Sequence, residues 1–505
     1  MAEDQRARII RGGRVLEPRA HRAPEADLLI EGDTIARIGP PGMAAPEDAV
    51  AIDARRRLLH PGLVNAHMHG HGGLAKGMGD RWTLELLLTA APWLNGGRSD
   101  QERALSTRIG AVEMVLKGCT AAYDLYIDLP LPSGEGLAAV AAAYREVGMR
   151  AVVAPMVADL SLFEAIPGLA ESLSPGLGRD VERYRMAPGQ ATLEAIAAGL
   201  EGARLHGAEI RAAVAPTIPL HCSDDFFVRC ARLAEEFGVG LHSHVSESKV
   251  QALSALKRYD GSIIAHLDGL GVLGPGFVAA HGVWLDGDDM ARLADHGASV
   301  AHNPGSNMRL GSGLADARAM LDSGLNIGIG TDGAQCSDNL NMYEAMRIAS
   351  LVSKSRGPEY GRWLSTEEVF AAATEGSARA LGFGDAIGRL EAGYKADIVF
   401  LDLGHINWVP MNDPTNQIVH TEDGGAVASV MIGGRMVLDE RRLTTVDIDA
   451  LGREAEAARA RLEAANADHR AMFERLEGAV GAFCTGLARQ PHHLHRYGAP
   501  AEDGK

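Results

Sequence analysis

Eight short apolar segments recur between residues 61 and 384, separated by Ala-rich stretches with helical periodicity. They read "GLVNAHMH", "CTAAYDLY", "MRAVVAP", "EIRAAVAP", "GVGLHSHV", "FVAAHGV", "ASVAHNP" and "NIGIGTDG". Apolar strands that alternate with helices indicate a parallel sheet, and eight such strands are the count of a TIM-type (β/α)8 barrel. We therefore predict an α/β protein in which residues 61–384 form this barrel.

The two ends of the chain have a different pattern. Residues 1–60 and 385–446 contain short Val-, Ile- and Leu-rich runs between Gly-rich turns, without a helical period. This pattern predicts a small β-sandwich domain built from both chain ends. Residues 447–505 begin with a helical pattern that has opposite charges at i,i+4 spacing. We interpret them as a C-terminal helical extension and tail that pack on the barrel or on a second subunit.

Two further segments depart from a minimal barrel. Residues 157–193 form a long Gly- and Pro-containing connection after the third strand, which we expect to act as a lid or a pocket wall. The tail contains three histidines in "HHLHR", which we interpret as a surface segment and not as a metal site.

Composition excludes several functional classes. The formal net charge of −17 argues against nucleic-acid binding, which requires clustered Lys and Arg. No apolar run approaches the roughly 18 residues that a membrane span requires, and no signal-peptide pattern opens the chain. The five cysteines are scattered without Cys-x-x-Cys spacing, which is typical of a reducing compartment. We therefore expect a cytoplasmic protein without nucleic-acid or membrane partners.

Two histidines end the first predicted barrel strand. His67 and His69 share one face of the strand because side chains alternate with a period of two. Buried imidazoles need partners for their nitrogens, and a divalent metal is a common one. The fifth strand adds His244 at its end and Glu247 three residues later, whereas His242 lies one layer deeper and is expected in the core.

The sixth strand ends at His281 and the eighth leads to Asp332. Each of these polar residues on its own is consistent with a hydrogen-bonded side chain at a barrel rim. In a (β/α)8 barrel, however, the active residues lie together at the C-terminal ends of the strands. The joint arrival of histidines and carboxylates at four strand ends therefore predicts a metal site.

The same segments carry a family resemblance. "NAHMH", "HVSE", "AAHGV", "HNPGSNMRLGSG" and "GTDGAQCSDNLNMYEAMR" resemble the amidohydrolase superfamily. The most similar branch is that of the aminohydrolases, which includes cytosine, guanine and S-adenosylhomocysteine deaminases and s-triazine hydrolases. The resemblance covers nearly the whole chain, including "GRLEAGYKADIVFLDL" near the second β-rich end.

The resemblance implies a role for each strand-end residue. It implies that Glu247 is the proton shuttle, that His281 faces the bound hydroxide, and that Asp332 is both a ligand and a proton acceptor. The implied metal ligands are His67, His69, His244 and Asp332.

Superfamily members with two metal ions bridge them with a lysine in the fourth-strand region. Residues 209–225 contain no lysine, so we predict one divalent ion per chain. Nitrogen and carboxylate ligands suit Zn²⁺ best, and Fe²⁺ or Mn²⁺ remain alternatives.

Several residues are candidates for contact with the substrate. Thr217 stands where many deaminases of the branch have a substrate-contacting histidine, and His221 is a possible substitute. This departure favours free bases or substituted triazines over nucleosides. His71 either contacts the substrate or forms a hydrogen bond within its loop. Trp93 and Asn303 complete the set of predicted contacts.

We therefore predict a hydrolytic deaminase that acts through a metal-bound hydroxide. Its expected substrate is an aminated N-heterocycle such as a purine, pyrimidine, pterin or s-triazine base. Hydrolysis of a ring C–Cl bond or of a cyclic amide on the same metal site is one alternative, and a non-catalytic assembly protein is another. We expect a small-molecule heterocyclic substrate and a homodimer or higher homo-oligomer.

Overall fold

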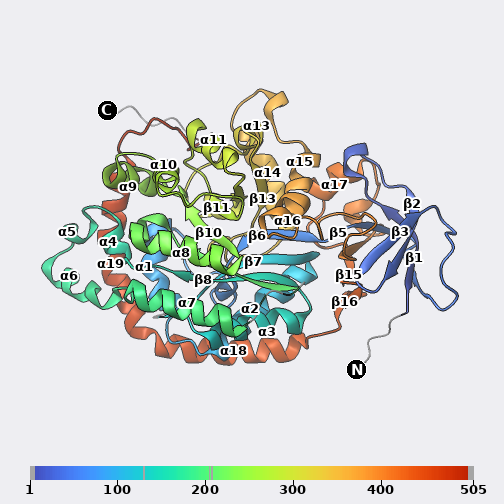
Figure 1. Ribbon diagram of the computed structural model, residues 1–505, viewed down its shortest axis with the longest axis horizontal. Coiled ribbons are helices and arrows are strands. Elements are labelled where there is room, and N and C mark those ends of the chain that lie inside the picture. The colour runs from blue at the N-terminus through green and yellow to red at the C-terminus, as the bar shows by residue number, and fades with distance from the viewer. Residues whose placement is uncertain (1–5, 129–130, 204, 206, 208, 499–505) are drawn as a thin grey trace.

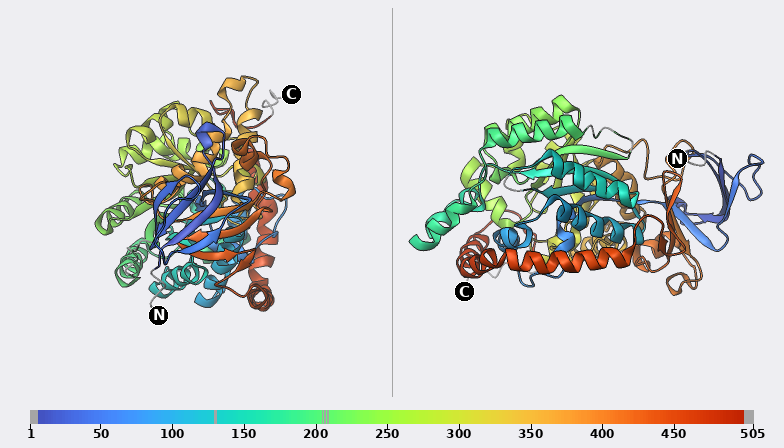
Figure 2. Two further views of the ribbon diagram at one scale, coloured as in Figure 1. Left: turned by 90° about the vertical axis from the view of Figure 1, so that its right-hand side faces the viewer. Right: turned by 90° about the horizontal axis from the view of Figure 1, so that it is seen from below.

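The computed structural model describes residues 6–128, 131–203, 205, 207 and 209–498. The molecule is elongated, with a helix-covered barrel at one end and a smaller β domain at the other (Figure 1). Seen from two further directions, the β domain contains both the first strands of the chain and strands from its last quarter (Figure 2).

Eight parallel strands form the barrel, in sequence order from β6 to β13. Asp332 N donates to His67 O over 3.0 Å, which brings the last strand against the first. Every segment in which we predicted a barrel strand contains one, so the predicted fold is confirmed. The strands are β6 (Leu63–Met68), β7 (Cys119–Ile127), β8 (Arg150–Val157), β9 (Ile210–Pro216), β10 (Gly240–Val245), β11 (Phe277–His281), β12 (Ser299–His302) and β13 (Asn326–Ile329).

Helices surround the barrel, and their boundaries follow from capping side chains. Ser99 and Glu102 form a reciprocal capping box at the start of α2, which satisfies backbone N–H groups that have no partner within the helix. The principal helices around the barrel are α1 (Leu84–Asn95), α2 (Asp100–Leu116), α3 (Gly134–Val147), α7 (Gly189–Ala203), α8 (Asp224–Phe237), α9 (Lys249–Tyr259), α10 (Ile263–Gly269), α11 (Gly287–Asp295), α12 (Pro304–Arg309), α13 (Ala317–Asp322), α14 (Met342–Ser355), α15 (Thr366–Ala371) and α16 (Ser377–Ala380).

A nine-stranded sheet from both chain ends forms the β domain. β5 from the N-terminal part pairs antiparallel with β14 from the C-terminal part, so neither end completes the sheet alone. Ile10, Leu28, Ile398 and Phe400 belong to one buried cluster inside it. The elements are β1 (Arg8–Val15), β2 (Glu25–Glu31), β3 (Thr34–Gly39), β4 (Val50–Asp53), β5 (Arg57–Pro61), β14 (Ile398–Asp402), β15 (Val427–Ile432), β16 (Arg435–Asp439) and β17 (Arg442–Leu443), with α17 (Pro414–His420) beside them.

A buried ion pair joins the two parts. Arg150, the first residue of β8, donates from Nε to Asp397 Oδ2 over 2.8 Å and from a second nitrogen to Oδ1 over 3.1 Å. Both side chains are 2% exposed. Asp397 also accepts from Gly433 N over 2.7 Å, which ties the turn after β15 to the same carboxylate.

We expect Arg150→Met to lower the free energy of unfolding by about 3–5 kcal/mol, because it leaves Asp397 as a buried charge without its partner. The shift of the urea denaturation midpoint measures this effect. Arg55→Met is the matched control, since it removes an exposed ion pair with Asp53 that is expected to contribute about 0–1 kcal/mol. Equal shifts for the two variants would show that the buried pair does not stabilise the joint.

The C-terminal extension packs on the barrel of its own chain. α18 (Ile448–Ala465) runs along the underside of the barrel in Figure 2, and Arg461 in it forms an ion pair with Glu102 of α2. α19 (Ala467–Ala488) packs against α1 and against the connection after β8, which folds into α4 (Leu162–Ala165), α5 (Leu169–Ser172) and α6 (Pro175–Val181).

The tail that follows α19 also lies on the barrel. Arg496 is buried and donates to the carbonyl oxygens of Val283 (2.9 Å) and Leu285 (2.7 Å) in the loop after β11. Within the described ranges, no helix has both the length and the apolar character needed to cross a membrane.

Candidate metal centre

Two imidazoles face each other at the C-terminal end of the barrel. His69 Nδ1 lies 2.6 Å from Leu125 O, and His244 Nδ1 lies 2.6 Å from Thr217 O. Because a carbonyl oxygen only accepts, both Nδ1 atoms carry the proton and donate it. The two Nε2 atoms, 3.2 Å apart, therefore present lone pairs toward each other. This arrangement is repulsive unless a cation or a proton lies between them.

A third imidazole reaches the same point from β6. His67 is fully buried, and its Nε2 has no hydrogen-bond partner among the described residues. Its Nδ1 lies 3.2 Å from Nε2 of His242, whose ring in turn packs against Tyr123. His242 is thus deeper in the barrel, as its position in the strand predicts, and it contacts the ring of His67 from the interior of the barrel.

Asp332 and His281 complete the ring of polar groups. Asp332 Oδ1 lies 3.1 Å from His69 Nε2 and 3.7 Å from His67 Nε2. Asp332 Oδ2 lies 3.8 Å from His281 Nε2, and His281 Nδ1 lies 2.9 Å from Asn307 Oδ1, which orients the ring. His281 and Asp332 have φ values of 71° and 63°. Left-handed backbone is uncommon for such residues and is concentrated at functional sites.

The electrostatics of this cluster favour bound positive charge. Burial holds the pKa of His67 well below its ordinary value and lowers the pKa of His244 to about 3, which favours the neutral form in which an imidazole can bind a metal. Burial also acts against the charged forms of His69 and Asp332. Their mutual hydrogen bond and attraction outweigh it, raising the pKa of His69 and holding that of Asp332 well below its ordinary value.

The donor set fits a divalent metal ion. Donor atoms of His67, His69 and His244 lie within 4.8 Å of one another, as do those of His67, His281 and Asp332. The unpartnered Nε2 of His67 and the facing lone pairs of His69 and His244 are explained by a cation at their centre. Imidazole and carboxylate groups are ligands for Zn²⁺, Fe²⁺ and Mn²⁺.

A free carboxyl group lies beside this centre. Glu247 follows β10 in a turn that is fixed by Gln251, whose Oε1 accepts from Glu247 N over 2.9 Å. The side chain is 1% exposed, and its Oε2 has no hydrogen-bond partner within the described part of the chain. Oε2 lies 3.6 Å from His281 Nε2. Burial, together with the charges of Asp332 and Glu85, raises the pKa of Glu247 well above its ordinary value.

A cavity of about 500 Å³ opens above the centre, with His69, His244, Glu247 and Asp332 among its walls. Three of the five predicted substrate contacts line it: His71, Thr217 and His221. His71 accepts from Gln335 Nε2 at 3.3 Å, while its Nδ1 is buried without a partner. The imidazole is therefore held within its loop, and its buried Nδ1 carries a proton that no described group accepts.

The other two predicted contacts do not line the cavity. Trp93 packs against Trp82 and Phe473, with Arg470 over its ring, so it is directed toward the C-terminal helix α19. Asn303 is fully buried, and its side chain fits against the strand because Gly330 has no Cβ there. It lies in the interior, next to the backbone of His67.

Several residues of the site were given no role from the sequence. Asn307, which orients His281, lies in the quoted segment "HNPGSNMRLGSG", where Asn303 was chosen instead. Asp124, on the adjacent strand β7, accepts from Gly70 N over 2.7 Å and so fixes the turn after His69. Tyr184 and His469 line the cavity and lie within 3.2 Å of each other. No local signal identifies these two, because they are far apart in the sequence.

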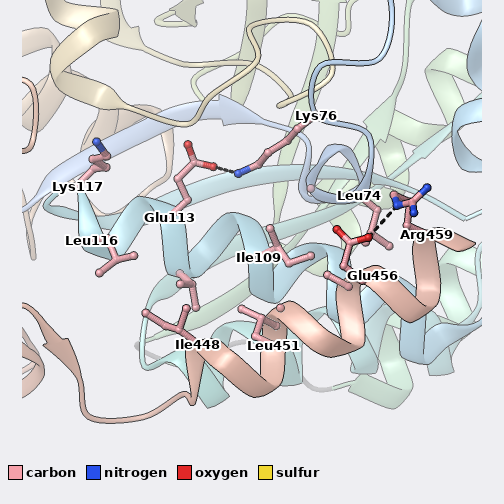
Figure 3. A pocket seen from close by; sticks show the side chains of 14 residues that line it. Leu74, Lys76, Ile109, Glu113, Leu116, Lys117, Ile448, Leu451, Glu456 and Arg459 are labelled. Carbon is pink, nitrogen blue, oxygen red and sulfur yellow. Dashed lines mark hydrogen bonds and ion pairs between the residues drawn. The ribbon is translucent and has the colours of Figure 1, made fainter.

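A second hollow, of about 450 Å³, lies between α2 and α18 (Figure 3). Its apolar walls include Leu74, Ile109 and Leu451. Its carboxylates are paired, Glu113 with Lys76 and Glu456 with Arg459 (Figure 3). Because the described residues of its lining include no unpartnered carboxylate and no histidine, they do not offer the chemistry of the cavity above the metal centre.

Comparison with known proteins agrees with this geometry. The amidohydrolase family model matches residues 58–437. The chain belongs to the amidohydrolase family. As a member of it, the protein is a hydrolase that acts on carbon–nitrogen bonds other than peptide bonds.

The names of proteins similar to this amidohydrolase describe deaminases and a chlorohydrolase. A 5'-deoxyadenosine deaminase from Methanobrevibacter smithii is 30% identical over 89% of this chain and 97% of its own. An adenosine deaminase from Xanthomonas campestris with bound zinc has a TM-score of 0.79 and 27% identity, covering 90% of this chain and 98% of its own. An atrazine chlorohydrolase from Arthrobacter aurescens complexed with zinc has a TM-score of 0.79 and 25% identity, covering 89% and 99%.

Proposed function

We propose that the protein is a metal-dependent hydrolytic deaminase of an aminated N-heterocycle, with one divalent ion per chain, most simply Zn²⁺. The observation that carries the proposal is the buried, unpartnered carboxyl group of Glu247 beside the metal centre. The relatives with deaminase names and the zinc-containing structural neighbours support it. β9 and the turn after it contain no lysine that could bridge a second ion.

A divalent ion held by His67, His69, His244 and Asp332 would supply Lewis acidity and lower the pKa of a bound water. His281 holds the attacking water in place, because its ring is fixed by Asn307 and its Nε2 faces both carboxyl groups. Asp332 Oδ2 accepts the proton of that water.

Glu247 performs the two proton transfers that deamination needs. Attack on a ring C=N bond places charge on the adjacent ring nitrogen, and the protonated Glu247 neutralises it. The Glu247 carboxylate left behind then removes the remaining proton of the added hydroxyl group and delivers it to the departing nitrogen, because an amide anion is too basic to leave. The proton held by Asp332 restores the protonated Glu247 for the next turnover. A carboxyl group with a raised pKa is suited to this task, because the raised pKa favours its proton-bearing form.

One alternative reaction has a specific observation in its favour. The likeness to an atrazine chlorohydrolase makes hydrolysis of a ring C–Cl bond a second candidate for the same metal site. The third possibility, a non-catalytic assembly protein, is not supported, because all the expected ligand and shuttle residues are present and lie together.

The test is a product assay with zinc-loaded protein and a panel of aminated purines, pyrimidines, pterins and s-triazines. We expect replacement of one amine by oxygen in the mass spectrum, with ammonia or an alkylamine released in equal amount. Chloride release from chlorinated analogues without deamination of the panel would establish the alternative reaction. Opening of hydantoins or lactams, with no change in the panel, would assign the protein to the cyclic-amide hydrolases.

A further inference from the structure

The cavity beyond the metal centre has a wall of hydrocarbon side chains. α1 contributes Leu84, Leu87 and Leu88, the end of β8 contributes Met156, and the connection after it contributes Leu160 and Phe163. A volume of about 500 Å³ lies within the range of pockets that enclose a whole drug-sized ligand. The cavity is thus larger than a bare one- or two-ring base requires, and the additional space is apolar.

The carboxylates of the cavity are confined to the metal end. Glu247 and Asp332 are the acidic side chains in its lining, within the described residues. A ribose diol is commonly fixed by a carboxylate that binds its hydroxyl groups. Asn95 offers a single unpartnered acceptor, Oδ1, because its Nδ2 donates to Ala91 O over 3.2 Å. The apolar wall therefore lacks the carboxylate that commonly fixes a ribose diol.

Four arginines line the cavity, and the two buried ones bind groups of the chain itself, although Nε of Arg98 has no hydrogen-bond partner among the described residues. Arg98 is buried and donates to the carbonyl oxygens of His71 and Leu94. Arg103 forms ion pairs with Asp100 and Asp128.

The other two arginines are at the mouth. Arg183 and Arg185 are exposed to solvent, and Arg183 donates to Tyr184 Oη over 3.1 Å. Because water already solvates these charges, they do not require an anionic group inside the cavity.

We infer that the substrate carries an uncharged hydrocarbon substituent, such as a linear alkyl or benzyl group, in place of a ribose. This inference rests on the proposed function for the position of the heterocycle at the metal end. The substituent lies along the wall formed by α1 and the 157–187 connection. The hydrocarbon side chains of this wall exclude water from it, and each methylene buried there contributes to binding.

The experiment measures binding separately from turnover. The probes are 9-methyl-, 9-ethyl-, 9-propyl- and 9-butyladenine and the corresponding N-alkyl-diamino-s-triazines, with adenosine and 9-(3-carboxypropyl)adenine for comparison. Zinc-loaded Glu247→Gln protein is titrated calorimetrically with each. We expect the Kd to fall about threefold to fourfold per added methylene in at least one series. Adenosine and the carboxypropyl compound are expected to bind no more tightly than the methyl compound.

The outcomes separate this inference from the proposed function. Tighter binding of adenosine than of the butyl compounds would overturn the inference in favour of a nucleoside, and tighter binding of the carboxypropyl compound would favour an anionic substituent. A flat alkyl series would also overturn it. Amine release by the wild-type protein from the bound compounds tests the proposed function. If no amine is released although the alkyl trend is present, the proposed deamination is contradicted and the inference about the substituent stands.

A cavity-filling variant tests whether the substituent lies against the apolar wall. Ala91 of α1 lines the apolar part of the cavity, so Ala91→Phe is expected to remove the gain from methyl to butyl and to leave the methyl compounds within about twofold. Ala457→Phe, on the exposed face of α18, is the matched control and should retain the whole trend. An unchanged trend in Ala91→Phe would show that the substituent does not lie against this wall.

Discussion

Asp332→Asn protein is expected to contain less than a tenth of the wild-type metal and to have no activity above background, while it remains folded. The substitution removes the only anionic group among the four proposed ligands, and neutral imidazoles alone hold a divalent ion less tightly. Elemental analysis of dialysed protein, expected to give about one ion per wild-type chain, measures the effect.

The barrel has its own apolar interior, which includes Val64, Leu125, Ala213 and Val278. Circular dichroism of the Asp332→Asn protein should therefore match that of the wild type, because a catalytic ion is not the main source of stability. His492→Ala is the control, because it removes a histidine of the tail that is not a proposed ligand, and this variant should retain the metal. Two ions per wild-type chain, or active protein without any ion, would contradict the mononuclear assignment.

The barrel, and the meeting of the candidate ligands at one end of it, could be predicted because their signals are local. The eight strands are apolar segments of similar length, and the side-chain period of two places His67 and His69 on one face without knowledge of the fold. Strand order follows from the rule that consecutive βα units are neighbours. His244, His281 and Asp332 then meet because parallel strands end at the same edge of the barrel.

The walls of the cavity could not be predicted, because they depend on contacts between distant segments. Trp93 was predicted to contact the substrate, yet Phe473 and Arg470 of α19 lie against it from almost 380 positions further along the chain. The same helix brings His469 to the cavity beside Tyr184. No periodicity in a single sequence indicates which segments the C-terminal extension will cover.

The orientation of individual polar side chains was also outside the reach of sequence patterns. Asn303 and Asn307 belong to one motif, and only the structure distinguishes the buried side chain against Gly330 from the one that binds His281. His71 had two predicted roles, and the structure shows the hydrogen bond of one of them: Gln335 donates to its Nε2, while its Nδ1 is buried without a partner among the described residues.

Glu247→Gln protein is expected to keep its metal and to lose turnover by roughly 10²–10⁴, the usual contribution of a general acid–base group. The glutamine has nearly the same shape, and its backbone N–H still donates to Gln251, so the turn is preserved. Steady-state kinetics together with elemental analysis of the same sample check both parts. Loss of metal would make Glu247 a ligand, and a decrease of less than about tenfold would assign the shuttle to another group.

The pH dependence of the activity is a second test of Glu247 as the proton shuttle. Burial raises the pKa of Glu247, and the proton-bearing form is the active one, so wild-type activity should fall as the pH rises through that pKa. The residual activity of Glu247→Gln should lack this alkaline decrease.

Glu85→Gln is the matched control: Glu85 is also buried and accepts from Ser248, but does not line the cavity. Its removal takes away a nearby negative charge, so the decrease should move to lower pH while the maximal rate stays within about tenfold of wild type. An unshifted profile in Glu85→Gln, or an alkaline decrease that persists in Glu247→Gln, would mean that the titrating group is not Glu247.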